Sequence, residues 1–140
     1  MTTQRFSDLR IWQAAHDLAL NMHSVSQEFP QEEKYGVGGQ LKRSSALVPA
    51  RIAEGYGKYY LRDKVRLMEA AKSDAVVTQN HLLLSRDLGY IDGAQVDELV
   101  AAYDGLLAGI SKFIGATSKR KAAEKTDAEQ PTKKNVEEGK

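Results

Sequence analysis

The residues best suited to chemistry in this sequence are cations and tyrosines gathered between Gln40 and Lys72. Eight basic residues lie in this stretch, opposed by only three acidic ones. Clustered lysine and arginine attract anions such as nucleic-acid phosphates, and tyrosine rings among them can stack on bases. The pattern indicates an RNA or DNA site made of the following residues: Lys42, Arg43, Arg51, Lys58, Tyr59, Tyr60, Arg62, Lys64 and Arg66.

A second interpretation of the same charges stays open. Between Asp87 and Gly115 the balance reverses, with five acidic residues against Lys112. The basic stretch is then a solvated helix face that also contacts acidic helices of neighbouring subunits. The net charge of +1 favours this alternative slightly, because dedicated nucleic-acid binders carry a strongly basic footprint.

No arrangement typical of an enzyme accompanies these residues. Glu54 has no second carboxylate at helical spacing, and Arg51 and Lys58 lie three and four positions away, which favours an ion-pair role. His16 and His23 are two turns apart, too far for the i,i+4 pair that binds zinc. Phosphate loops of the form G-x-x-x-x-G-K-[ST] and nucleophile motifs of the form G-x-S-x-G are absent. We expect no enzymatic activity, no metal and no cofactor.

Apolar residues recur at spacings of three and four, which predicts the helices that must position these side chains. The expected helices cover residues 8–27, 40–57, 60–87 and 92–115. Ser7 is the expected N-cap of the first helix, Gly89 the C-terminal cap of the third, and Asp92 followed by Gln95 resembles a capping box. Short connections between long helices predict an all-α, antiparallel up-down-up-down four-helix bundle.

The second expected helix contains a proline. Pro49 has no N–H, so the carbonyl of Ser45 loses its helical partner, at a cost of about 3 kcal/mol unless it is compensated. We expect the hydroxyls of Ser44 and Ser45, or water, to compensate, and we expect the helix to bend. The alternative is a helix that stops at Val48 and restarts at the proline. The apolar seam continues in phase through Ile52, which favours the bent helix.

Residues 48–55, Val-Pro-Ala-Arg-Ile-Ala-Glu-Gly, resemble the Ile-Pro-Ser-Asn-Ile-Ala-Glu-Gly signature of the four-helix-bundle proteins encoded in 23S ribosomal RNA intervening sequences. The similarity extends over residues 8–115 through further motifs in the same order: Ile11-Trp12-Gln13, Phe29-Pro30, Gln40-Leu41-Lys42-Arg43 and Leu88-Gly89-Tyr90-Ile91. The chain departs from the family at Ala50-Arg51, where the family has Ser-Asn. It also has Val77 and Gln79 where the family's third helix has two glutamates.

The resemblance implies a bacterial homo-oligomer with a ring-like arrangement, a pentamer. More distantly, the chain resembles the accessory bundle proteins of diversity-generating retroelements, pentameric barrels that work with a reverse transcriptase and its RNA. Gly105 and Gly109, four apart on one helix, independently indicate a face suited to close helix contact. Two roles fit these features: a bundle that binds nucleic acid or a ribonucleoprotein, and a purely structural or protein-interaction oligomer. A third class, an enzyme of unknown type, would require a deep pocket with converging polar groups around Glu54.

The apolar periodicity stops near Ala116. We therefore expect an N-terminal extension at 1–7, a bundle at 8–115, and a polar tail at 116–140 that is disordered or loosely helical. No continuous apolar run approaches the roughly 20 residues of a bilayer span, so no membrane partner is expected. The sequence has no cysteine, which excludes disulfide and thiolate chemistry and suits a cytoplasmic protein.

Overall fold

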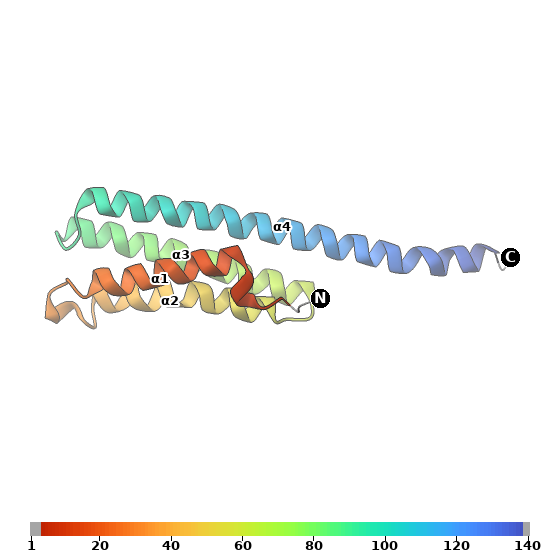
Figure 1. Cartoon of the computed structure of the whole chain (residues 1–140), viewed down its shortest axis with the longest axis horizontal. Helices are drawn as coiled ribbons and strands as arrows, with labels where there is room; N and C mark the ends of the chain where they lie inside the picture. Colours follow the sequence, from red (N-terminus) through yellow and green to blue (C-terminus); the bar gives the residue numbers. More distant parts are fainter. Residues whose placement is uncertain (1–3, 139–140) are drawn as a thin grey trace.

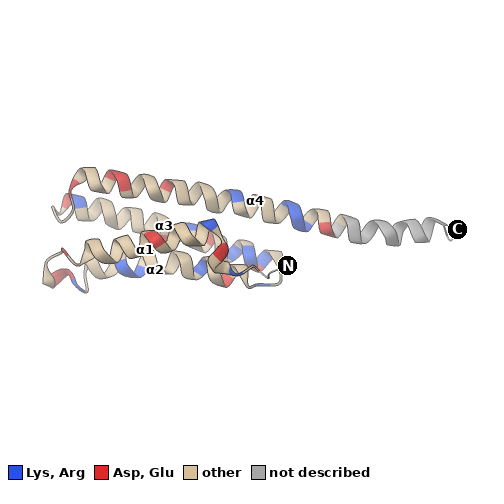
Figure 2. Ribbon diagram, in the orientation of Figure 1, with Lys and Arg blue, Asp and Glu red and all other residues tan. Residues whose placement is uncertain are grey.

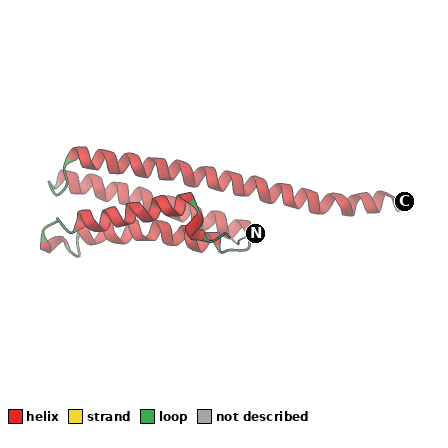
Figure 3. Cartoon of the chain, viewed as in Figure 1, coloured by secondary structure: helices red, strands yellow, loops and turns green. Residues whose placement is uncertain are grey.

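The computed structural model describes residues 4–138, and within this range it is built of helices and short connections (Figure 3). The four α-helices are α1 Arg10–Ser26, α2 Val37–Tyr56, α3 Leu61–Asp87 and α4 Gly93–Glu138. Two short 3-10 helices accompany them, η1 Phe6–Asp8 before α1 and η2 Gln31–Glu33 before α2. The predicted class, an all-α four-helix bundle, is confirmed.

Consecutive helices are joined at alternate ends of the molecule (Figure 1). The α1–α2 and α3–α4 connections lie at one end, and the α2–α3 connection lies at the other. Helix α2 packs against both α1 and α3, while α4 packs mainly against α3 and less extensively against α1. This layout places the start of α3, where several predicted site residues lie, beside the part of α4 that leaves the bundle.

The core is formed by apolar side chains that recur at helical spacing on the facing sides of all four helices. Fully buried members include Ala15, Met22, Leu41, Val48, Ile52, Ala71, Ala75, Leu82, Val96, Tyr103 and Ile110. Burial of a large apolar side chain contributes about 1.5 to 3 kcal/mol, so this interior is the main source of stability. It also fixes which faces of α2 and α3 are left for the charged residues.

The helix ends confirm some of the predicted caps and correct one. Leu9, and not Ser7, occupies the N-cap position of α1, because Ser7 lies within the preceding 3-10 helix. Gly89 has φ +83°, the left-handed conformation that ends α3 at low cost to glycine. The Asp92 carboxylate accepts a hydrogen bond from the Ala94 N–H at 3.1 Å, as expected for a cap of α4.

Helix α2 runs through Pro49 without interruption, so the alternative of a helix that restarts there is not found. The bend at this position stays a prediction. The expected compensation by serine hydroxyls is wrong: Ser45 Oγ donates to the Lys42 carbonyl, and Ser44 Oγ is paired with Thr78 Oγ1 on α3 at 2.7 Å. A serine hydroxyl in a helix reaches back one turn, away from its own carbonyl, so water is the remaining candidate for the free carbonyl.

Helix α4 is longer than the sequence predicted. It continues past Ala116 to Glu138 and projects beyond the other helices (Figure 1). Beyond Thr117 no described side chain is buried, but alanine, lysine, arginine and glutamate favour helix without burial. A helical segment after residue 115 is one of the two states expected for the tail. Disorder of the 116–140 segment stays a prediction, and the side chains of 125 and 127–140 lie outside the described residues.

One stretch of α4, Gly93–Glu124, is long and apolar enough, by length and composition, to cross a membrane. The stretch is not a continuous apolar run, because Asp97, Glu98, Asp104 and Lys112 interrupt it. Its side chains Tyr103, Leu106 and Ile110 are buried in the bundle core, but only 17% of the apolar window is buried within the single chain. The absence of a membrane partner stays a prediction.

Candidate nucleic-acid interface

The predicted cations divide into two groups along the molecule. Lys42 and Arg43 lie in the first half of α2, whereas most of the others lie in the α2–α3 connection and the first turns of α3. Figure 2 shows the second group as basic segments gathered near the end from which α4 projects. At 1.5 Å per residue, Lys42 is separated by roughly 21 Å from Tyr56, the last residue of α2 before the connection. The structure therefore does not bring all predicted residues into one site.

Arg51 is engaged by α3. Its Nε donates to the Asp74 carboxylate at 3.2 Å, and the side chain of Asp74 is only 18% exposed. An arginine held by a half-buried carboxylate is a poorer phosphate ligand than a free one, because the partner must first be released. Arg51 thus belongs to the α2–α3 contact more than to the open basic surface.

The cations near the α2–α3 connection are held loosely. Lys58 Nζ lies 4.0 Å from Glu54, the ion-pair role expected for that glutamate, and an Arg66 nitrogen lies 3.8 Å from Asp63. Long, exposed contacts of this kind contribute about 0 to 1 kcal/mol, so they do not prevent either cation from binding a phosphate. Arg62 is exposed to solvent.

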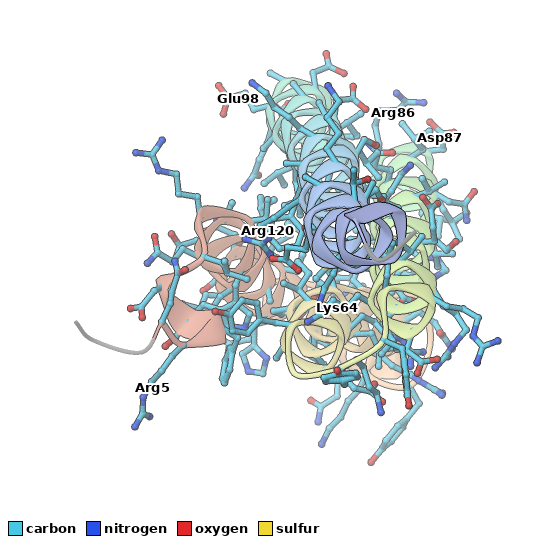
Figure 4. The ribbon with its side chains drawn as sticks, turned by 90° about the vertical axis from the view of Figure 1, so that its right-hand side faces the viewer. Arg5, Lys64, Arg86, Asp87, Glu98 and Arg120 are labelled. Atoms are coloured by element: carbon cyan, nitrogen blue, oxygen red, sulfur yellow. The ribbon has the colours of Figure 1, made fainter. Side chains whose placement is uncertain are left out.

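Lys64 lies deeper than its neighbours at this end. Its Nζ donates to the Tyr56 carbonyl at 2.8 Å and sits 5.7 Å from the centre of the Tyr56 ring. Burial, and then the positive charges of Lys121 and Arg120, lower the pKa of Lys64. Figure 4 looks along the bundle from this end and labels Lys64 and Arg120. The lowered pKa thus reflects burial first, and the nearby cations of α4 add to it.

Tyr59 and Tyr60 in the connection face solvent. Their side chains are 79% and 63% exposed, and their ring centres lie 5.0 Å apart with the planes nearly perpendicular. The expectation that these rings are available for stacking fits this placement. Tyr56, by contrast, is partly buried, and its hydroxyl donates to the Gln4 carbonyl at 3.1 Å.

A family model described as 23S rRNA-intervening sequence protein matches residues 7–112 of this chain. The chain belongs to that family. None of the curated proteins matches it. The matched range contains the predicted site residues and most of the bundle, but it ends before the part of α4 that projects. The resemblance inferred from the motif around Pro49 is confirmed.

In this member of the 23S rRNA-intervening sequence protein family, α4 supplies cations that sequence reasoning missed. Arg120 is exposed, and Lys121 Nζ lies 5.7 Å from the centre of the Tyr59 ring. Both residues follow the point where the apolar periodicity ends. The sequence therefore placed them in a loose tail and gave no reason to expect them beside α3. The signal that points to them is the dense basic run 119–121, Lys-Arg-Lys, next to the last apolar residues of α4.

The described residues offer little support for a metal site or for an enzymatic site. Over the part of the chain that the structure describes, no three His, Asp, Glu or Cys side chains are arranged to hold a metal ion. The side chain of Glu54 is 51% exposed, an environment unlike the enclosed sites that tune catalytic carboxylates. The absence of a metal, a cofactor and an enzymatic activity stays a prediction.

Proposed function

We propose that this protein is a non-enzymatic, oligomeric four-helix bundle of the cytoplasm that binds RNA or DNA, alone or within a ribonucleoprotein. One observation carries the proposal: loosely held cations and exposed tyrosines from separate elements meet at one end of the bundle. We call this the basic end, and it consists of Lys58, Tyr59, Tyr60, Arg62, Lys64, Arg66, Arg120 and Lys121.

The energetics of the basic end favour an anionic polymer. Its ion pairs are long and exposed, so exchanging them for phosphate contacts costs little. Each phosphate neutralised releases counterions from the nucleic acid, which supplies a favourable, salt-dependent free energy. The phosphates of the partner would neutralise the cations of the basic end, which Glu54 and Asp63 contact only at long distance.

Self-association is supported by an apolar face on α3. The face consists of four residues of α3 and its C-cap Leu88, which share 40–51% exposure in the single chain: Val76, Val77, Leu83, Leu84 and Leu88. A row of exposed apolar side chains on one helix marks a contact surface in many proteins. A homo-oligomer, a pentamer by the family resemblance, would cover it.

Gly105 and Gly109 of α4 differ in their surroundings. A Cβ at Gly109 would lie 3.3 Å from Ile11, so this glycine accommodates α1 within the chain. A Cβ at Gly105 would meet no atom of the described residues within 4 Å. Only Gly105 is therefore left as a close-contact position toward another subunit.

The alternative is a structural or protein-interaction oligomer without nucleic-acid binding. The observation in its favour is the same apolar face on α3 together with the acidic residues of α4, which suit contacts between subunits. In that arrangement the basic end is neutralised by acidic helices of a neighbour. The two functions therefore differ in whether the basic end stays open in the oligomer.

Fluorescence anisotropy with structured RNA, single strands and duplex DNA tests the binding proposal. We expect binding at about 50 mM salt that weakens as salt rises. Arg62→Glu and Arg66→Glu should weaken binding to all sequences alike, and removal of each phosphate ligand should reduce the log–log salt slope by about 0.7 to 0.9. Arg86→Glu, at the opposite end of α3, is the matched control. Absence of binding to every probe would leave the structural alternative.

Native mass spectrometry at micromolar concentration tests the assembly. A discrete oligomer is expected, and Leu84→Glu on the exposed face of α3 should dissociate it without unfolding the helices. A wild-type protein that is monomeric across this range would refute the oligomeric part of the proposal, while the binding measurement would still decide the rest.

A further inference from the structure

A shallow groove lies at the basic end, between the α2–α3 connection and the projecting part of α4. Its volume is about 350 Å³, and it is lined by Tyr59, Tyr60, Leu61, Ser118, Lys121 and Ala122. Ligand pockets in proteins span about 300 to 1,000 Å³, so the groove is large enough for one planar group. One wall comes from the loop and the first residue of α3, and the other comes from a segment that the family match does not reach.

The tyrosines of this groove have little role in packing. A buried tyrosine gains a large apolar contribution, but Tyr59 and Tyr60 leave most of their surface in water. The two rings contact each other edge to face and do not enter the core. Paired, exposed aromatic rings beside a groove are the form that stacking platforms for bases take.

Positive charge surrounds the groove from two helices. Lys121 of α4 places its ammonium over the Tyr59 ring at 5.7 Å, and its ion pair with Glu124 is long, at 3.9 Å. Lys64 of α3 lies at the same end, where its Nζ donates to the Tyr56 carbonyl at 2.8 Å; burial, and then the charges of Lys121 and Arg120, lower its pKa. A ligand with a flat apolar ring and an adjoining phosphate therefore matches both the tyrosine rings that line the groove and the positive potential of the lysines beside it.

We propose that this groove binds an unpaired base of a single-stranded nucleic acid, with Arg120, Lys121 and Lys64 near the flanking phosphates. The inference rests on the proposed function and specifies its partner. Stacking on Tyr59 or Tyr60 requires a free base face, and base faces in a duplex are covered by their neighbours. Cations alone do not distinguish a single strand from a duplex, so the rings are what give the preference.

The test compares full-length variants on two probes: labelled oligothymidylate of about 16 nucleotides and a blunt DNA duplex of similar length. Tyr59→Ala and Tyr60→Ala should weaken single-strand binding by about 5- to 150-fold and leave duplex binding nearly unchanged. Tyr59→Phe should retain wild-type affinity, because the ring remains. Lys121→Gln should reduce the salt slope by about 0.7 on the single strand.

Tyr35→Ala is the matched control for the loss of an exposed ring. Tyr35 is 88% exposed and has its own neighbouring cation, with Lys34 Nζ 5.7 Å from the ring centre, but it lies in the α1–α2 connection at the other end of the bundle. Its removal should leave the affinity for both probes unchanged. Thermal unfolding followed by circular dichroism checks that each variant is folded.

The outcomes separate this inference from the function on which it rests. If Arg62→Glu weakens both probes equally and the tyrosine variants bind like wild type, the basic end binds phosphates but the groove does not bind a base, and the inference is overturned alone. If neither probe binds the wild-type protein, the groove proposal is overturned, and the measurement with structured RNA decides the proposed function. If Tyr35→Ala and Tyr59→Ala lost the same affinity for the single-stranded probe, specific binding in the groove would also be refuted.

Discussion

The Nε of Arg51 on α2 lies 3.2 Å from a carboxylate oxygen of Asp74 on α3. The other ion pairs found among the described residues join positions no more than four apart in sequence. Arg51 stands where the family signature has asparagine. This substitution therefore adds a contact between helices, although the sequence alone suggested an added phosphate ligand.

We predict that Arg51→Gln affects stability more than nucleic-acid affinity. The pair is partly exposed, so its loss should cost up to about 1 kcal/mol of unfolding free energy. A double-mutant cycle with Asp74→Asn, followed by urea unfolding, isolates the pair. Anisotropy should show a smaller loss of affinity than in Arg62→Gln. An equal or larger loss would return Arg51 to the binding surface.

The buried hydroxyl pair Ser44–Thr78 should be a sensitive position between α2 and α3. Thr78 Oγ1 lies 2.7 Å from Ser44 Oγ and donates to the Asp74 carbonyl at 2.8 Å. Thr78→Val should cost about 1 to 3 kcal/mol, because it leaves the serine hydroxyl buried without its partner. Adding Ser44→Ala should recover part of the loss. Strictly additive costs in denaturant unfolding would contradict the coupling.

Tyr103→Phe should be neutral or stabilising. Tyr103 is fully buried, and its hydroxyl has no hydrogen-bond partner of good geometry among the described residues, although Thr78 lies nearby. Burial raises the pKa of Tyr103. Removing an unsatisfied hydroxyl removes a desolvation cost of about 1 to 3 kcal/mol, and the ring still fills the core. Calorimetry that shows a clear drop in melting temperature would reveal a hidden partner.

His81 should make stability depend on pH. Burial lowers the pKa of His81 in the folded protein, and its Nδ1 is buried without a partner among the described residues. The unfolded chain then binds the proton more readily, so this contribution is complete above about pH 6.5 and is lost as the pH falls through the lowered pKa. His81→Gln should flatten the melting temperature between about pH 7 and 5. The same pH dependence of the melting temperature in His81→Gln and in the wild type would contradict this prediction.

Truncation after Thr117 should leave the melting temperature and the oligomeric state nearly unchanged. Thr117 is the last buried residue among the described side chains of α4, so the removed segment contributes little to the core. Calorimetry and native mass spectrometry check the two properties. Dissociation of the oligomer on truncation would show that the projecting part of α4 takes part in assembly.

The sequence was enough to predict the core, because periodicity at three and four is a direct record of which side of a helix is buried. It could not predict the end of α4, since helix propensity continues after apolar periodicity stops and only tertiary placement shows where the packing ends. It also could not assign Arg51, whose partner Asp74 is distant in sequence. The groove beside Tyr59 forms between residues that are far apart in sequence. For this reason Tyr59 and Tyr60 were predicted as site residues, but Ser118, Lys121 and Ala122 of α4 were not.

At the opposite end of the bundle, the Tyr90 hydroxyl donates to a Glu33 carboxylate at 2.8 Å, and its ring lies 5.3 Å from that of Phe29. These contacts tie the α1–α2 connection to the turn between α3 and α4. Two loops that would otherwise open separately are joined into one cooperative unit. Their amide protons should therefore exchange with solvent at similar rates, and Tyr90→Phe should let the first loop exchange ahead of the second.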